Sequence, residues 1–185
     1  RPALRPLRLR EEEVSAIPTI ETARLRLRPP VEADFDSAAA FLAGPRARFV
    51  GGPYAREAAW RAFAACVGGW ILQGFGYWAV EERTGGALAG AVGFIGRPIF
   101  PEIELGWDLY EARFEGRGYA TEAAEAARGW AFGTGLAGTL ISVIHPENAR
   151  SIRVAERLGA ARDRSVAAGD PEDVVYRHAP PGGGP

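Results

Sequence analysis

Hydrophobic and polar residues recur along this chain with two different periods, and the change from one period to the other separates strands from helices. Leu25 and Leu27 alternate with arginines, which is the pattern of a half-buried strand. Trp60, Phe63 and Trp70 recur at helical spacing instead. Applied along the chain, these patterns predict strands at 23–28, 77–82, 87–96, 102–109, 139–145, 160–166 and 173–178, and helices at 31–43, 56–73, 117–132 and 148–158.

The order of these elements indicates the fold class. Thr84, Gly85 and Gly86 are turn residues between two predicted strands, so those strands should form an antiparallel hairpin. The helix at 117–132 stands between two strands and can serve as the crossover of a parallel pair. Its predicted buried stripe consists mostly of small residues: Ala120, Ala123, Ala124, Ala127 and Trp130. We therefore predict an α/β (α+β) fold, with a mixed, mostly antiparallel central sheet and helices on both faces.

Length and end composition predict one folded domain with a short segment on each side. A chain of 185 residues fits a single domain. We expect a flexible N-terminal segment at 1–18 and a folded domain at 19–178. The segment at 179–185 consists of proline and glycine after one alanine, so we expect it to be a disordered tail.

Charge and composition narrow the possible functions. The net charge is −1, so nothing global favours nucleic acid or a membrane surface as a partner. Cys66 is the only cysteine, which excludes an internal disulfide and favours a reducing compartment. Residues 1–13 contain no apolar signal core, and a cytoplasmic location is expected. His145 and His178 have no ligand spacing, so we expect no metal site.

The candidate chemistry lies at 115–122, where a glycine-bearing segment follows a predicted strand and opens a helix. A helix start carries unpaired N–H groups and positive dipole charge, and glycine lets a bulky anion approach the backbone. The segment therefore suits a pyrophosphate, to which Arg117 can add a charge-assisted contact. A P-loop would need a lysine, and the chain has none. A dinucleotide fold would need a third glycine where Thr121 stands.

Several blocks of sequence resemble the GNAT superfamily of acetyltransferases, in particular its RimJ/RimL-type branch. The acetyl-CoA loop of the family reads Gln/Arg-x-x-Gly-x-Gly/Ala, and residues 115–120 fill that frame with Gly118 and Ala120 at the small positions. Residues 113–118 also match, but the continuation Gly-Tyr-Ala-Thr-Glu-Ala is typical of this branch in the first register. The other similar blocks are 24–29, 104–109 and 148–160. The resemblance covers about 19–177.

The resemblance implies acetyl-CoA as a cosubstrate, held in a gap where two central parallel strands splay apart. Main-chain groups of Asp108 and Leu109 would meet the pantetheine and acetyl portions, and an N–H there would polarise the thioester carbonyl. Glu115 stands where the family has Gln or Arg, so its carboxylate is expected to point away from the phosphates. The implied cofactor-binding residues are Asp108, Leu109, Glu115, Gly116, Arg117, Gly118, Tyr119, Ala120, Thr121, Asn148 and Arg153.

The resemblance also implies which residues carry the transfer. A carboxylate must help the attacking amine to lose its proton. Glu104 is the candidate base, and Glu102 competes because it shares the same strand face. Ala155 stands where many family members have the tyrosine that protonates the leaving thiolate, and Ser151 is the candidate that replaces it. For Ser151, and for Asn148, a helix-capping role stays open.

The acceptor implied by the resemblance is a primary amine, either of a small molecule or of a protein N-terminus, and the sequence leaves both open. Because Ala155 and Glu115 depart from the family pattern, a non-catalytic domain that senses acyl-CoA is the alternative. A homodimer is also left open. Cys66 is expected to have a packing role. The residues that would shape the acceptor pocket are Phe49, Trp70, Phe75 and Tyr77.

Overall fold

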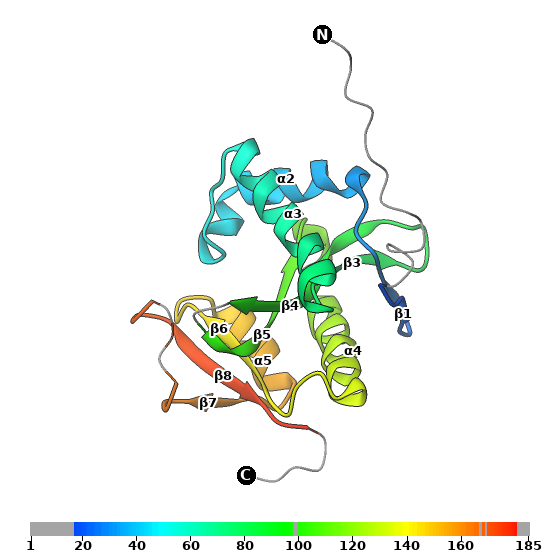
Figure 1. Ribbon diagram of the computed structural model, residues 1–185. Helices are drawn as coiled ribbons and strands as arrows, with labels where there is room; N and C mark the ends of the chain where they lie inside the picture. Colours follow the sequence, from blue (N-terminus) through cyan, green and yellow to red (C-terminus); the bar gives the residue numbers. More distant parts are fainter. Residues whose placement is uncertain (1–16, 98–99, 167, 169, 181–185) are drawn as a thin grey trace.

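The computed structural model describes residues 17–97, 100–166, 168 and 170–180. Within this part the strands form one sheet in the order β1-β2-β3-β4-β5-β6-β8-β7 (Figure 1). The strands are β1 (Ile20–Glu21), β2 (Leu25–Arg28), β3 (Tyr77–Glu82), β4 (Leu88–Arg97), β5 (Phe100–Leu109), β6 (Leu140–Ile144), β7 (Ala161–Asp163) and β8 (Val174–His178). Of the segment expected to be flexible, 1–18, and the tail expected to be disordered, 179–185, residues 1–16 and 181–185 lie outside the described part.

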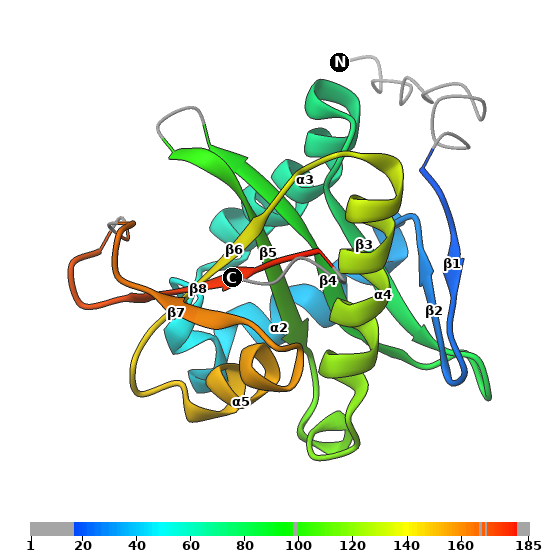
Figure 2. The same ribbon diagram turned by 90° about the horizontal axis from the view of Figure 1, so that it is seen from below.

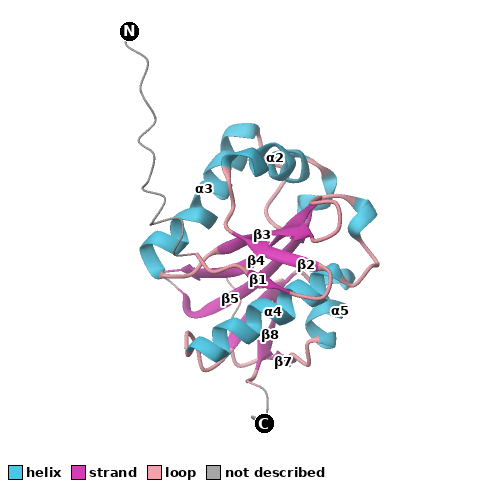
Figure 3. Ribbon diagram, turned by 90° about the vertical axis from the view of Figure 1, so that its right-hand side faces the viewer, coloured by secondary structure: helices cyan, strands magenta, loops and turns pink. Residues whose placement is uncertain are grey.

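Helices cover both faces of this sheet. The α-helices are α2 (Phe35–Ala43), α3 (Arg56–Gln73), α4 (Tyr119–Thr134) and α5 (Ala149–Arg157), and the short 3-10 turns are η1 (Glu32–Asp34), η2 (Pro45–Phe49) and η3 (Ala112–Phe114). α2 and α3 lie on one face and α4 and α5 on the other, as Figures 2 and 3 show from two sides. The predicted fold class is confirmed. Among the described helices, none has the length and apolar character that crossing a bilayer requires.

The sheet is antiparallel except where β5 and β6 meet. β5 pairs with β4 in continuous register from Glu104 to Leu109, and again at Phe100 after an irregularity. With β6 it shares a single registered pair in the described residues, Glu104 with Ile141. Residues 105–109 of β5 therefore continue past β6 without ladder pairing on that side. This arrangement matches the splayed parallel pair that the sequence resemblance implied.

Two helix starts differ from the sequence prediction for local reasons. α4 begins at Tyr119, two residues later than predicted, because Gly118 has a left-handed φ of 80° and serves as its N-cap. α2 begins at Phe35, after a 3-10 turn. In that turn the carboxylate of Asp34 accepts a hydrogen bond from the N–H of Val31 at 2.9 Å. The chain entering α2 is thus fixed by this side chain together with the 3-10 bond from the N–H of Asp34 to the carbonyl oxygen of Val31.

The largest core lies between the sheet and α4. The two alternating leucines of β2, Leu25 and Leu27, are fully buried, which contributes about 2 kcal/mol each to the free energy of unfolding. On α4 the predicted alanine stripe packs against the strands, with Ala123, Ala124 and Ala127 buried. The small side chains allow the helix axis to approach the sheet closely. The pattern of apolar positions therefore identified this core correctly.

The predicted apolar face of α3 is only partly buried, which corrects the sequence prediction. Trp70 is buried, whereas Trp60 is 44% exposed and Ile71 is 62% exposed. The reason is a close backbone approach, since a Cβ on Gly69 would stand 2.7 Å from the carbonyl oxygen of Phe75. α3 therefore turns its glycine side towards the chain that enters β3. The spacing of apolar residues alone does not reveal which side of a helix will make such a close backbone contact.

Candidate active site

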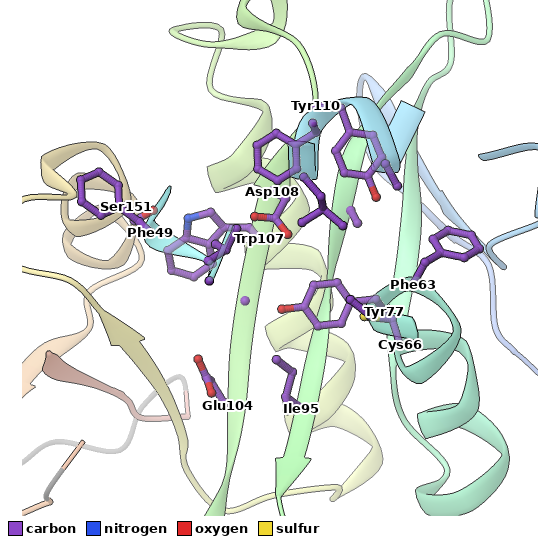
Figure 4. A pocket seen from close by; sticks show the side chains of 18 of the residues that line it. Phe49, Phe63, Cys66, Tyr77, Ile95, Glu104, Trp107, Asp108, Tyr110 and Ser151 are labelled. Atoms are coloured by element: carbon purple, nitrogen blue, oxygen red, sulfur yellow. The ribbon is translucent and has the colours of Figure 1, made fainter. Parts of the chain in front are cut away.

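A cavity of about 520 Å³ lies between the sheet and helices α2 and α3, and it extends to the start of α5. This volume is typical of sites for small molecules. Glu104 and Asp108 of β5 line the cavity together with Ser151 of α5 (Figure 4). The cavity thus joins the gap beside β5 to a chamber beneath α2 and α3. We call the part lined by Phe41, Phe63, Cys66, Tyr77, Asp108 and Tyr110 the chamber.

The glycine-bearing loop lies beyond the C-terminal end of β5 and suits an anion. Gly116 and Gly118 have left-handed φ angles of 71° and 80°. The first backbone bond of α4 runs from Glu122 to Gly118, so the N–H groups of residues 119–121 stay outside the helical ladder. A Cβ on Gly116 would meet nothing within 4 Å, and the hydroxyl of Thr121 is buried without a partner. These features fit a pyrophosphate approaching the backbone.

Side-chain contacts hold this loop in place. Arg117 pairs with Glu82 at 3.0 Å, and its guanidinium lies 4.5 Å from the ring centre of Tyr119. Arg24 donates to the carbonyl oxygen of Arg117 at 2.8 Å and pairs with Glu122 at 2.6 Å. The exposed Arg117 side chain therefore has a carboxylate partner already. A phosphate contact from Arg117 would exchange Glu82 for the anion or share the guanidinium between them.

Glu115 is committed to two arginines from other elements. It pairs with Arg46 of η2 at 2.5 Å and also with Arg150 of α5. Arg46 in addition donates to the carbonyl oxygens of Leu109 and Tyr110, each at 2.8 Å. The acid that departs from the family pattern thus ties the loop to the rim of the cavity. Sequence reasoning noted the departure at Glu115 but missed Arg46, because no local pattern connects the two.

Strand pairing decides which backbone groups of β5 face the gap. The N–H of Tyr110 donates to the carbonyl oxygen of Ala89 at 2.9 Å. Because main-chain groups alternate in an antiparallel pair, those of Asp108 point towards β4, and those of Trp107 and Leu109 point towards β6. Leu109 therefore has the orientation expected for a cofactor contact, whereas the backbone of Asp108 has the opposite one. Trp107 was not among the predicted cofactor residues.

The two candidate bases are separated by the structure. Glu104 lines the cavity. Glu102 lies outside the lining and forms an ion pair with Arg177, at 2.5 Å and 2.9 Å, which lowers the pKa of the Glu102 carboxyl. Glu102 and Glu104 lie on the same face of β5, but only Glu102 pairs with the arginine that β8 supplies. Of the two, Glu104 is the carboxylate that can reach a molecule in the cavity.

The start of α5 brings two predicted residues together. Ser151 and Asn148 both line the cavity. The side chain of Asn148 caps α5 by accepting a hydrogen bond from the N–H of Ser151 at 3.2 Å. Ala155 is buried in the position where many relatives have a tyrosine. Arg153 is exposed on α5 and lies outside the lining of the cavity.

The chamber contains ionisable groups whose pKa values are raised by burial. Burial raises the pKa of Asp108 to about 6 from its usual value near 3.8, and the charge of Arg46 opposes the shift. Burial also raises the pKa of Cys66 to about 12 and moves the pKa of the Tyr77 and Tyr110 hydroxyls upward. The side chain of Asp108 was missed by sequence reasoning. Strand alternation was the signal that could have identified it. Glu104, Gly106 and Asp108 are alternate residues of one strand and therefore lie on the same face.

A glycine pair positions the hydroxyl of Tyr77. In the sheet Tyr77 stands opposite Gly93, which stands opposite Gly106. A Cβ on Gly106 would lie 2.0 Å from the Tyr77 Oη, so only glycine leaves room for the tyrosine there. The hydroxyl points towards β5 between the levels of Glu104 and Asp108 (Figure 4). The packing of β3, β4 and β5 thus places two carboxylates of β5 and one hydroxyl of β3 on a common wall of the cavity.

The remaining predictions about the pocket are only partly confirmed. Phe49 and Tyr77 line the cavity, and Cys66 also lines it instead of serving packing alone. Trp70 and Phe75 are buried outside the lining, and the indole N–H of Trp70 donates to the carbonyl oxygen of Tyr77 at 3.0 Å. These two residues support the chamber wall from behind.

The histidines have structural surroundings. His178 is buried, its Nε2 lies 3.0 Å from the hydroxyl of Ser142, and burial lowers its pKa to about 4. His145 stacks on Phe49 with ring centres 5.0 Å apart. In the part of the chain that the structure describes, no three His, Cys, Asp or Glu side chains are grouped to hold a metal ion.

Comparison with solved structures agrees with this fold. An acetyltransferase from Agrobacterium tumefaciens strain C58 is 45% identical in sequence and superimposes with a TM-score of 0.85, over 89% of this chain and 95% of that one. A GnaT-family acetyltransferase structure from Bordetella pertussis, described as putative in its name, is 25% identical with a TM-score of 0.73, over 88% and 100% of the chains.

Sequence comparison gives the family directly. The uncharacterized protein YkkB of Bacillus subtilis strain 168 is 30% identical over 105 residues, which span 56% of this chain and 60% of that relative. The acetyltransferase (GNAT) domain family matches residues 24–161, most of the described part. Members of this family use acetyl-CoA in general, as the loop at the start of α4 would require. The chain belongs to the GNAT family of acetyltransferases.

Proposed function

We propose that this protein is an N-acetyltransferase that moves the acetyl group of acetyl-CoA to a primary amine by direct attack in a ternary complex. One observation carries the proposal: a single cavity is lined both by the start of α5 beside the strand gap and by the carboxylates of β5. Acetyl-CoA entering through the gap would therefore meet an acceptor held in the chamber. The motif blocks at 24–29, 104–109 and 148–160 support the RimJ/RimL-type branch.

The donor would be held mainly by backbone. The N–H groups at the start of α4 would bind the pyrophosphate, with Gly116 and Gly118 providing the close approach. Main-chain groups of Trp107 and Leu109 face the gap and are oriented to meet the pantetheine arm. An N–H in this row would polarise the thioester carbonyl and stabilise the negative charge that develops on its oxygen.

Two side chains would move protons. The attacking amine must be a free base, and Glu104 would accept its proton directly or through a water. The new C–N bond forms as the C–S bond breaks, and the departing thiolate needs a donor. Ser151 would supply a hydroxyl there, since Ala155 has no proton to give. A domain that binds acyl-CoA without turnover is the second candidate, and Ala155 is the observation that favours it.

Isothermal titration with acetyl-CoA tests the donor side first. We expect stoichiometric binding by the wild type and a loss of at least 100-fold in the Gly118→Asp variant, because a carboxylate at the helix start repels phosphate. Gly85→Asp is the matched control: Gly85 also has a left-handed φ, and a Cβ there would meet nothing within 4 Å. Acetyl-CoA binding without release of free thiol, across a panel of amines, would favour the sensing alternative. Absence of binding by folded wild type would remove both candidates.

A further inference from the structure

The described lining of the cavity carries five carboxylates and no cationic side chain of its own. Its carboxylates belong to Asp34, Glu104, Asp108, Asp170 and Asp173. Among the described lining residues none is arginine or histidine, and the chain has no lysine at all. A cationic ligand would find partners in this cavity, whereas a carboxylate would be desolvated without a positive charge beside it.

Three polar groups of the chamber lack a protein partner. Within the described residues, no hydrogen bond reaches the carboxylate of Asp108 or the hydroxyls of Tyr77 and Tyr110. Asp34 differs, because Arg28 donates to both of its carboxylate oxygens at 2.8 Å. These groups face the cavity, where a ligand with several donors can satisfy them together. An ammonium group has three N–H donors and a positive charge.

The rest of the chamber is apolar. Among the residues that define it, Phe41 and Phe63 supply aromatic walls. A bound peptide would bring an N–H and a carbonyl at every residue, and each buried group would need a partner. Its polar side chains are those of Asp108, Tyr77 and Tyr110 together with the Cys66 thiol, so it matches a ligand with one polar head and an apolar body.

We propose that Asp108, Tyr77 and Tyr110 form an ammonium-binding subsite for a small amine that has an apolar body and no carboxylate. This inference rests on the proposed transferase function and names its acceptor class. Asp108 accepts one N–H bond of the ammonium and the tyrosine hydroxyls accept a second, which leaves the third proton for Glu104. Glu104, on the same strand face, then takes the proton whose loss frees the nitrogen lone pair for the new C–N bond. The apolar body packs among the aromatic walls.

Direct binding measurements without acetyl-CoA test the subsite independently of turnover. The probe is 2-phenylethylamine, and its matched partner is L-phenylalanine, which has the same body and amine but adds a carboxylate. A short C-terminally amidated peptide with a free N-terminus represents the protein-acceptor alternative. We expect the amine to bind at least 10-fold more tightly than either competitor. Equal or tighter binding of the amino acid or the peptide would overturn the assignment.

Variants locate the binding energy. Asp108→Asn removes the charge at nearly constant shape, and we expect it to weaken amine binding at least 10-fold. Tyr77→Phe removes one acceptor and should weaken binding several-fold. Asp36→Asn is the control, because Asp36 is an exposed residue of α2 that does not line the cavity. The Asp108 variant should keep or raise its melting temperature, since burial penalises the native charge.

The two proposals fail in different ways. Unchanged amine affinity in a folded Asp108→Asn variant, or no binding of the amine to wild type, removes the subsite even if acetyl-CoA binds normally. Amine binding that needs Asp108, in a protein that does not bind acetyl-CoA, leaves the subsite and removes the transferase function. Both measurements use the full chain, so each outcome decides one proposal.

Discussion

The loop at the start of α4 and the chamber are built from different parts of the chain. At the α4 end, eight consecutive residues, 115–122, form a loop and a helix start whose exposed N–H groups suit phosphates. In the chamber, by contrast, the polar groups come from separate strands, Tyr77 from β3 and Asp108 from β5, and the walls come from α2 and α3. One end relies on backbone and the other on side chains.

This difference teaches which part of an enzyme a sequence motif can describe. Backbone groups are the same in every residue, so a backbone site is marked by glycines and a helix start within one short segment. A side-chain site needs residues that meet only after the sheet has formed. The donor end is therefore expected to be shared by relatives, and the chamber is expected to distinguish this protein from them. The following changes test that division.

The largest effect is expected from Glu104→Gln in the chamber. Loss of the proposed base should lower kcat for the best amine by about 100-fold, within the range typical of general-base catalysis. The affinity for acetyl-CoA should stay within about threefold, because the backbone end is untouched. The steady-state rate over a pH series supplies the measurement. An unaltered rate with an unaltered acid limb would remove Glu104 as the base.

A smaller, purely steric effect is expected from Gly106→Ala. The added Cβ would lie 2.0 Å from the Tyr77 Oη, so the tyrosine must move away from the wall it shares with Glu104 and Asp108. We expect kcat/KM for the amine to fall about 30-fold, in line with what small misplacements cost. Adding Tyr77→Phe should relieve the clash and recover part of the rate. The double variant, compared with each single variant, is the control.

The smallest effect is a pH dependence of amine binding. Asp108 interacts with Cys66 of α3, Tyr77 of β3 and Arg46 of η2, and with Tyr110, which directly follows β5. The thiol and the hydroxyls stay neutral from pH 8 to 5 because their pKa values are raised, and the arginine stays charged. Asp108, with a pKa of about 6, gains a proton as the pH falls through that value.

The amine remains cationic from pH 8 to pH 5, so only the negative charge of its partner Asp108 is lost as the pH falls. Titration with 2-phenylethylamine should show affinity falling about 10-fold from pH 8 to pH 5, as a single carboxyl with this pKa requires. The Asp108→Asn variant should bind weakly at both pH values with little slope. A slope that persists in this variant would assign the titration to another group of the chamber, such as Glu104.

Much of the fold followed from local patterns. The alternation at Leu25 and Leu27 and the small stripe of α4 both describe how one element meets its neighbour, and both were confirmed. The orientation of α3 was wrong, because the close approach at Gly69 depends on where β3 lies and not on the helix itself. The start of α2 also differed, because the carboxylate of Asp34 accepts a hydrogen bond from the N–H of Val31 within a 3-10 turn that precedes the helix.

By itself the sequence determined the family and the order of elements, since each is written in short segments or in a periodic pattern. Only the tertiary structure decided that Glu102 pairs with Arg177 while Glu104 lines the cavity, because β8 lies far along the chain. It also decided that Asp108 presents its side chain rather than its backbone to the site. Strand register and splay fix these directions, and neither is encoded in any one segment.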